Sequence, residues 1–195
     1  MQVAVKYPSV LLAHAQRGDC VQQLARDLSV QVATILSVQA RASLLLPGGS
    51  SPQQLLPLLA AEPLEWARVD VSPTDERWVA ADAEQSNWRL LQQGLPAAAC
   101  LDPRQADSAQ ASASLWADQL QARMPFAAVL LGMGEDGHIA SLFPGMPGLA
   151  PALDLQAVPG ALCAQAPSEP RQRLSLNLPM LLQTQWLGLL AFGQS

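Results

Sequence analysis

Positive charge and histidine are scarce in this 195-residue chain. It contains one lysine, Lys6, and two histidines, His14 and His138, and its net charge is −5. No cluster of basic residues occurs along it, which argues against nucleic acid or an anionic membrane surface as a partner. An anion bound by this protein must therefore be held by arginine side chains and backbone N–H groups.

Long apolar runs are also absent, although half of the residues are hydrophobic. No segment reaches the length that spans a bilayer, and the apolar patch near the N-terminus is too short for a signal peptide, so we expect a cytoplasmic protein. Cys20, Cys100 and Cys163 lie far apart and fit neither a disulfide framework nor zinc-ligand spacing. We expect reduced, mostly buried thiols.

Short β-like runs alternate with helix-like segments along the chain. The patterns predict strands at 42–47, 67–72, 126–134 and 186–193, the last of them buried, and helices at 86–95 and 106–124. Ser86 is a natural N-cap, and the continuous apolar run 126–134 is typical of a central parallel strand covered on both faces. This alternation predicts a doubly wound, mostly parallel α/β sheet.

Two helix predictions can be tested residue by residue. Leu115, Trp116, Leu120 and Met124 share one face of the predicted helix 106–124, so we expect that face to be buried. Pro57 lies inside the helix expected after the double glycine, and it should kink or shorten that helix.

Polar clusters follow three of the predicted strands, where ligands bind in such a sheet. In GGSSP (48–52), two glycines allow close backbone approach and the following helix offers free N–H groups, which predicts a phosphate or oxyanion site. An ordinary tight turn would have the same pattern. In DER (75–77), Asp75 could accept a bond from a sugar hydroxyl or orient a base, and Arg77 could clamp an anion. The alternative for DER is a solvated loop with a local ion pair.

The third cluster, residues 132–141, contains His138 in a loop with several glycines. Asp136 could hold one imidazole N–H and leave the other ring nitrogen as an acceptor, an arrangement that suits general-base work on water. The stretch 139–145 is expected to begin a short helix facing the same cleft. His14 has no such surroundings, and we expect it to be structural or exposed.

Four blocks of this sequence closely resemble, in order, the motifs of the 6-phosphogluconolactonases: LLLPGGSSP, LEWARVDVSPTDERWVAADAEQSN, LLGMGEDGHIASLFPG and RQRLSLNLPML. The resemblance covers most of the chain. It implies the Rossmann-like fold shared with glucosamine-6-phosphate deaminase, ribose-5-phosphate isomerase and CoA-transferases. It also implies hydrolysis of 6-phospho-D-glucono-1,5-lactone to 6-phosphogluconate, in the oxidative pentose phosphate pathway, with neither a metal nor an organic cofactor.

The same resemblance implies roles for individual residues. His138 would be the general base that activates water against the lactone carbonyl, and Asp136 or Asp75 would orient it or the sugar. The expected substrate-binding residues are Gly48, Gly49, Ser50, Arg77, Asn87, Gly134 and Arg173. We expect a small phosphorylated lactone as the partner and a monomer or homodimer.

Glucosamine-6-phosphate deaminases also carry a double-glycine loop and an Asp-Gly-His sequence. They have a glutamate in the tail after the histidine, whereas this chain has Phe143 there, which favours the lactonase.

Two departures from the family pattern leave alternatives open. QAPSEPRQR lacks the family's lysine, and FGQS ends one residue before another family lysine. We expect one domain, 1–195, without the family's final strand and helix. It could be a fragment, a shortened member in which Arg171 or Arg173 compensates, or a non-catalytic protein that binds phosphosugars.

Overall fold

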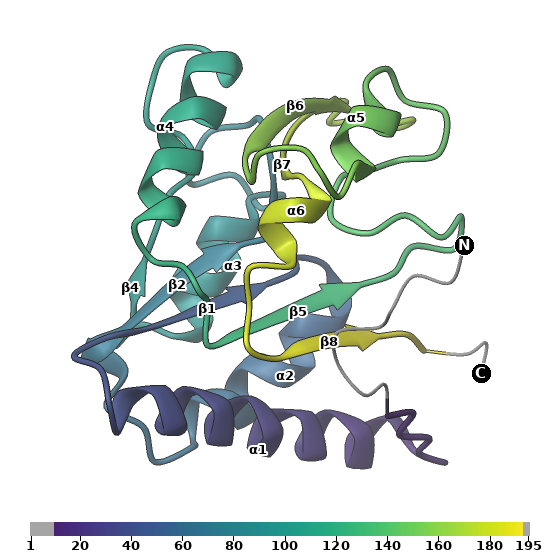
Figure 1. The fold of residues 1–195 in the computed structure, drawn as a ribbon. Coiled ribbons are helices and arrows are strands. Elements are labelled where there is room, and N and C mark those ends of the chain that lie inside the picture. The colour runs from purple at the N-terminus through teal and green to yellow at the C-terminus, as the bar shows by residue number, and fades with distance from the viewer. Residues whose placement is uncertain (1–9, 193–195) are drawn as a thin grey trace.

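A five-stranded parallel sheet forms the centre of the protein (Figure 1). The computed structural model describes residues 10–192, apart from the side chains of Ser50 and Ser51, so Lys6 lies outside the described residues. The strand order is β4–β2–β1–β5–β8. The strands are β1 (Ala42–Leu46), β2 (Val69–Pro73), β4 (Ala99–Cys100), β5 (Ala128–Gly132) and β8 (Leu187–Leu190). The predicted parallel α/β sheet is confirmed.

Helices cover both faces of this sheet (Figure 1). On one face lie α1 (Arg17–Leu36), α2 (Ser50–Ala60) and α3 (Asn87–Gly94), and a short 3-10 helix, η1 (Trp66–Arg68), precedes β2. On the other face lie α4 (Ala109–Gln121) and α6 (Leu178–Leu181), and α5 (Leu149–Leu153) stands further out. No helix among residues 10–192 is long and apolar enough to cross a membrane.

Side-chain alternation along the central strands divides the interior into two cores. In β1, Leu44 and Leu46 pack with α1 and α2, whereas Leu45 packs with α4. In β5, Leu130 joins the first core and Leu131 the second. Because successive side chains of a strand point to opposite faces, a strand covered on both faces is largely apolar on both, although β2 also buries Asp70 and Ser72. This requirement explains the unbroken apolar runs in the sequence.

A second, antiparallel sheet stands beyond the carboxyl ends of the central strands. Its order is β3–β7–β6, formed by β3 (Asp75–Arg77), β7 (Gln172–Leu176) and β6 (Ala161–Gln165). Leu174 and Leu176 of β7 pack into the core beneath α4, around Trp116. The DER cluster is thus a short strand rather than a solvated loop.

Several local predictions were wrong. Leu115 is 44% exposed, and Met124 follows the end of α4, so the buried face of that helix centres on Trp116 and Leu120. Of the two effects expected of Pro57, shortening does not occur, because α2 continues to Ala60; a kink stays a prediction. β8 is an edge strand and is exposed at two of its leucines rather than buried throughout.

The three cysteines are free thiols and half-buried rather than mostly buried. Burial raises the pKa of Cys100 to about 11, so this thiol stays protonated at neutral pH.

The fully buried carboxylate of Glu76 fixes helix α3 to strand β3. It accepts hydrogen bonds from the backbone N–H groups of Asn87 at 2.8 Å and Trp88 at 2.7 Å, and from the hydroxyl of Ser86 at 3.1 Å. Arg104 Nη1 lies 3.0 Å from the same carboxylate. Ser86 itself caps the helix by accepting from the N–H of Arg89, as predicted. The first turn of α3 therefore depends on a charge supplied by another element.

We expect Glu76→Ala to lower the free energy of unfolding by about 3–5 kcal/mol, because Arg104 and the first N–H groups of α3 lose a buried partner. Urea unfolding followed by circular dichroism measures the difference. Glu65→Ala is the matched control: its carboxylate pairs with Arg68 but is 70% exposed, so its loss should stay below about 1 kcal/mol. Equal losses in the two variants would contradict the capping role.

Candidate active site

Three loops leave the carboxyl ends of neighbouring strands and meet at one edge of the central sheet. β1 lies between β2 and β5, so the double-glycine turn after β1 is flanked by β3 on one side and by the histidine loop on the other. Pro47, directly after β1, lies beside Gly132 at the end of β5, 3.7 Å from where a side chain would begin. The clusters predicted to lie together are therefore adjacent.

The double-glycine turn begins helix α2 and packs against the start of α3. A methyl group at Gly48 would lie 1.8 Å from the side-chain oxygen of Asn87, so only glycine fits beside that amide. Gly49 has a φ of +96°, a conformation that glycine adopts without strain, and it provides no side-chain cap for α2. The first N–H groups of α2 consequently lack a cap from Gly49, as an anion site requires. Ser50 begins α2, and its side chain lies outside the described residues.

Two arginines face each other across the second sheet. Arg77 of β3 and Arg173 of β7 are directly opposite in the antiparallel register, and Arg173 is only 7% exposed. Burial lowers the pKa of Arg173, and the positive charge of Arg77 lowers it further. Arg77 donates to the carbonyl of Gln85 at 2.7 Å, while its buried Nε has no hydrogen-bond partner. Two close guanidiniums with spare donors are suited to an anion that bridges them.

Asp75 is buried on the same face of β3 as Arg77, because residues two apart in a strand share a face. Its Oδ2 accepts the hydroxyl of Ser141 at 2.5 Å, and its backbone carbonyl accepts the amide of Asn87 at 2.8 Å. Asp75 thus contacts the histidine loop three residues beyond His138.

His138 is paired with Asp136 inside its own loop. Imidazole Nδ1 lies 2.5 Å from Asp136 Oδ1, and the same oxygen accepts the backbone N–H of His138 at 3.2 Å. In the neutral ring, a carboxylate partner at Nδ1 fixes the proton there and leaves Nε2 as an acceptor. Of the two orienting aspartates that the sequence left open, Asp136 is the one that contacts the imidazole.

The surroundings of the imidazole are shaped on both sides. A methyl group at Gly134 would lie 2.2 Å from imidazole Cε1, so the space beside this glycine is filled by the ring of His138. The ring of Phe143 packs on it, with centroids 4.4 Å apart, and the His138 side chain remains 28% exposed. The imidazole is therefore held in place but still reaches solvent.

The short helix predicted after His138 is wrong. Ile139 instead forms isolated β-bridges with Met133 and with Leu142, which close the loop back on the end of β5. Ala140 lies between them with a φ of +48°, in the left-handed region. A helix cannot begin where the backbone turns in this way.

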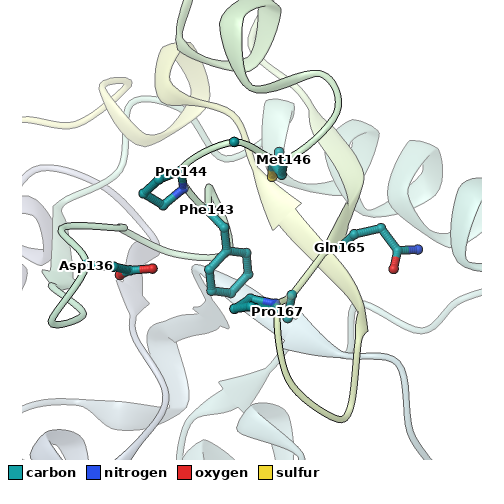
Figure 2. Close-up of a pocket in the computed structure, with 8 residues that line it drawn as sticks. Asp136, Phe143, Pro144, Met146, Gln165 and Pro167 are labelled. Atoms are coloured by element: carbon teal, nitrogen blue, oxygen red, sulfur yellow. The ribbon is translucent and has the colours of Figure 1, made fainter.

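A hollow of about 280 Å³ lies beside Asp136, away from the double-glycine turn. Figure 2 shows it between the histidine loop and the β6–β7 hairpin, with Asp136 pointing toward the ring of Phe143 and Pro167 beneath that ring. Its lining includes neither Arg77 nor Arg173. The hollow therefore borders Asp136 and Phe143, two residues that contact the imidazole, and is not lined by the two arginines.

Three buried side chains around these loops were not predicted: Glu76, Ser141 and Ser175. Ser141 is fully buried, and its N–H donates to the hydroxyl of Ser175 on β7 at 3.1 Å. No local pattern marks these contacts, because they join segments far apart in the sequence. Among residues 10–192, no group of three or more His, Cys, Asp or Glu side chains gathers as a metal site would require.

The fold defines a Rossmann-like α/β protein, and its edge of loops gathers groups that are suited to a small anionic ligand. The chain belongs to the family of glucosamine-6-phosphate isomerases and 6-phosphogluconolactonases, whose model matches residues 15–195. It is 38% identical to a 6-phosphogluconolactonase of Pseudomonas putida, over 97% of this chain and 81% of that protein.

Solved structures agree with this assignment. The chain superimposes on a 6-phosphogluconolactonase from Shewanella baltica with a TM-score of 0.85 and 32% identity, covering 93% of this chain and 80% of that one. A monomeric glucosamine-6-phosphate deaminase, 16% identical, has a TM-score of 0.69 over 91% of this chain and 80% of that one, which shows the shared fold alone.

The contact between His138 and Asp136 can be tested by measuring the pKa of the Asp136 carboxyl group. The hydrogen bond from the His138 side chain, followed by the one from its backbone N–H, lowers the pKa of Asp136. We expect His138→Ala to raise this pKa toward its ordinary value without reaching it, since the backbone donor remains. Carbon NMR titration of the carboxyl group gives the value, and His14→Ala should leave it unchanged.

The sign of the linked stability effect follows from the direction of the shift. A carboxyl whose pKa is lower in the folded state contributes stability above its unfolded pKa and loses it as the pH falls through the lowered value. His138→Ala should therefore lose less stability on acidification than the parent protein. An unchanged Asp136 pKa in that variant would contradict the contact.

Proposed function

We propose that this protein hydrolyses 6-phospho-D-glucono-1,5-lactone to 6-phosphogluconate. The observation that carries the proposal is the pairing of His138 with Asp136 at the end of β5, next to the double-glycine turn. The relatives that bear the name 6-phosphogluconolactonase, at 38% and 39% identity over most of the chain, support the same reaction.

The proposed chemistry needs one base and a positioned water. Nε2 of His138 takes a proton from water as the oxygen attacks the lactone carbonyl carbon, and the carbonyl oxygen carries the negative charge of the tetrahedral intermediate. The bond from that carbon to the ring oxygen then breaks, and the imidazolium returns its proton to the ring oxygen. Asp136 stabilises the imidazolium while it exists, because its carboxylate remains at Nδ1.

Binding of the phosphate away from the carbonyl would orient the substrate for this attack. Two groups of the site are suited to a doubly charged anion. One is the N-terminus of α2, at Gly48, Gly49 and Ser50, where Gly49 provides no side-chain cap. The other is the pair Arg77–Arg173. Asn87 and Asp75, which are hydrogen-bonded to each other, would meet ring hydroxyls. The proposed reaction draws on no metal and no organic cofactor.

Two further properties belong to this proposal. We infer a cytoplasmic location, which the bacterial relatives support, and a monomer or homodimer. Cell fractionation and light scattering of the purified protein decide these two points.

The base assignment predicts a large loss of turnover in one of two histidine variants. His138→Ala should lower kcat at least ~100-fold, because general-base catalysis contributes about that much or more. His14→Ala changes the only other histidine, which is exposed, and should keep full activity. Freshly generated lactone is followed in a coupled assay, with the spontaneous hydrolysis run in parallel.

The alternatives have distinct results. Full activity in His138→Ala would overturn the base assignment. Binding of 6-phosphogluconate in calorimetry without any acceleration would show a non-catalytic phosphosugar-binding protein. Release of ammonia from glucosamine 6-phosphate would indicate a deaminase. Phe143, at the position where the deaminases have a glutamate, packs against the imidazole and argues against that outcome.

The anion site predicts a change in KM rather than in kcat. Arg173→Lys keeps the charge but loses the planar fork of donors, so we expect KM to rise about tenfold or more with a smaller change in kcat. Arg171→Lys is the matched control, because the side chain of Arg171 pairs with Glu169 and is 65% exposed. An unchanged KM in Arg173→Lys would remove Arg173 from the binding site.

A further inference from the structure

The loop that carries His138 is closed near its start and anchored near its end. Near its start, the N–H of Gly134 donates to the carbonyl of His138 at 2.9 Å, and Met133 bridges Ile139. Beyond Ile139 the chain turns at Ala140, in a left-handed conformation that a residue with a side chain adopts at a cost. A contact made by the residues after Ala140 is therefore needed to stabilise that turn.

Ser141 is the residue that follows this turn, and it is completely buried. Its hydroxyl donates to Asp75 Oδ2 at 2.5 Å, and its N–H donates to the hydroxyl of Ser175 at 3.1 Å. Asp75 and Ser175 are directly opposite each other in the register of β3 and β7. The cross-strand pair Asp75 and Ser175 thus holds Ser141 through hydrogen bonds to both its side chain and its backbone.

The same carboxylate reaches the other side of the site. Asn87 donates to the backbone carbonyl of Asp75 at 2.8 Å and stands 3.4 Å from its Oδ1. The amide of Asn87 in turn fills the space beside Gly48. A continuous series of contacts therefore runs from the histidine loop through Ser141, Asp75 and Asn87 to the double-glycine turn.

We propose that Ser141 is a positioning residue for His138, and that Asp75 acts on the imidazole through Ser141 rather than by touching it. The inference rests on the proposed function for its kinetic consequence, but its structural consequence can be measured without turnover. Ser141 fixes the distance between the base and the anion-binding turn, because it ties the end of the histidine loop to the strand that also holds Asn87. The bond between His138 and Asp136 lies within the loop and does not depend on Ser141.

Ser141→Ala removes the hydroxyl that reaches Asp75 and leaves the loop sequence otherwise intact. We expect kcat to fall about 10- to 100-fold, since a small misplacement of a catalytic group has effects of that size. KM should change less than threefold, because Ser141 bonds Asp75 and Ser175 rather than the arginines suited to the phosphate. Ser112→Ala is the matched control: Ser112 is equally buried, in α4, and its hydroxyl bonds Gln105 and Ala106. It should lose stability and keep kcat.

A second measurement reports the position of the imidazole directly. The chain has two histidines, so a proton–carbon NMR spectrum of the imidazole Cε1–H groups contains two signals. Ser141→Ala should shift or broaden the signal of His138 and leave that of exposed His14 in place, while Ser112→Ala should move neither. Ser175→Ala, which removes the acceptor of the Ser141 N–H, should give a smaller change of the same kind.

The outcomes separate this inference from the proposed function. If the parent protein fails to accelerate hydrolysis, the proposed function fails, and the NMR signals still decide whether Ser141 positions His138. If Ser141→Ala keeps kcat and the His138 signal stays in place, Ser141 has no positioning role. A rise in KM with unchanged kcat would also overturn the proposal. Should Ser141→Ala fail to fold, Ser175→Ala decides, and an unmoved His138 signal in that variant contradicts the inference.

Discussion

The candidate active site depends on two neighbouring carboxylates that point to opposite faces of one three-residue strand. On β3, Glu76 accepts the first N–H groups of α3, and Asp75 accepts the hydroxyl of Ser141 in the histidine loop. Both side chains are buried, and a buried charge is stable only when its oxygens are paired. The pairing requirement of Glu76 therefore fixes the start of α3, and that of Asp75 fixes the histidine loop. Because both carboxylates are on β3, this strand also fixes the two segments relative to each other.

The central sheet explains why the reacting groups come from separate parts of the chain. Parallel strands end at the same edge, so the double-glycine turn after β1 and the histidine loop after β5 are neighbours although many residues separate them in the sequence. The two ends of a sugar phosphate make opposite demands. In the proposed function, the phosphate would need fixed positive charge from Arg77 and Arg173, whereas the carbonyl would need a base that can gain a proton, the role proposed for His138. Because the arginine pair and the imidazole lie apart, each can keep its own electrostatic environment.

Local chemistry was predictable from the sequence, and long-range pairing was not. The contact of Asp136 with His138 involves residues two apart in a glycine-rich loop, so it follows from the loop sequence alone. The opposition of Arg77 and Arg173 depends on the register of β3 against β7, which no local pattern encodes. The helix expected after His138 was wrong for a related reason. The sequence around Ile139 is compatible with a helix, but Ile139 pairs with Met133, and the backbone turns at the next residue, Ala140.

The alanine at position 140 adds a physical argument about rigidity. A left-handed conformation costs a residue with a side chain about 1–2 kcal/mol, and glycine would avoid that cost. Glycine would also give the unfolded and partly opened loop many more conformations, so the closed loop would be ordered at a larger loss of entropy. The two hydrogen bonds of Ser141, each contributing about 1 kcal/mol, offset the strain at Ala140. A strained turn held by buried bonds is stiffer than a relaxed glycine turn, and the base role proposed for His138 would benefit from that stiffness.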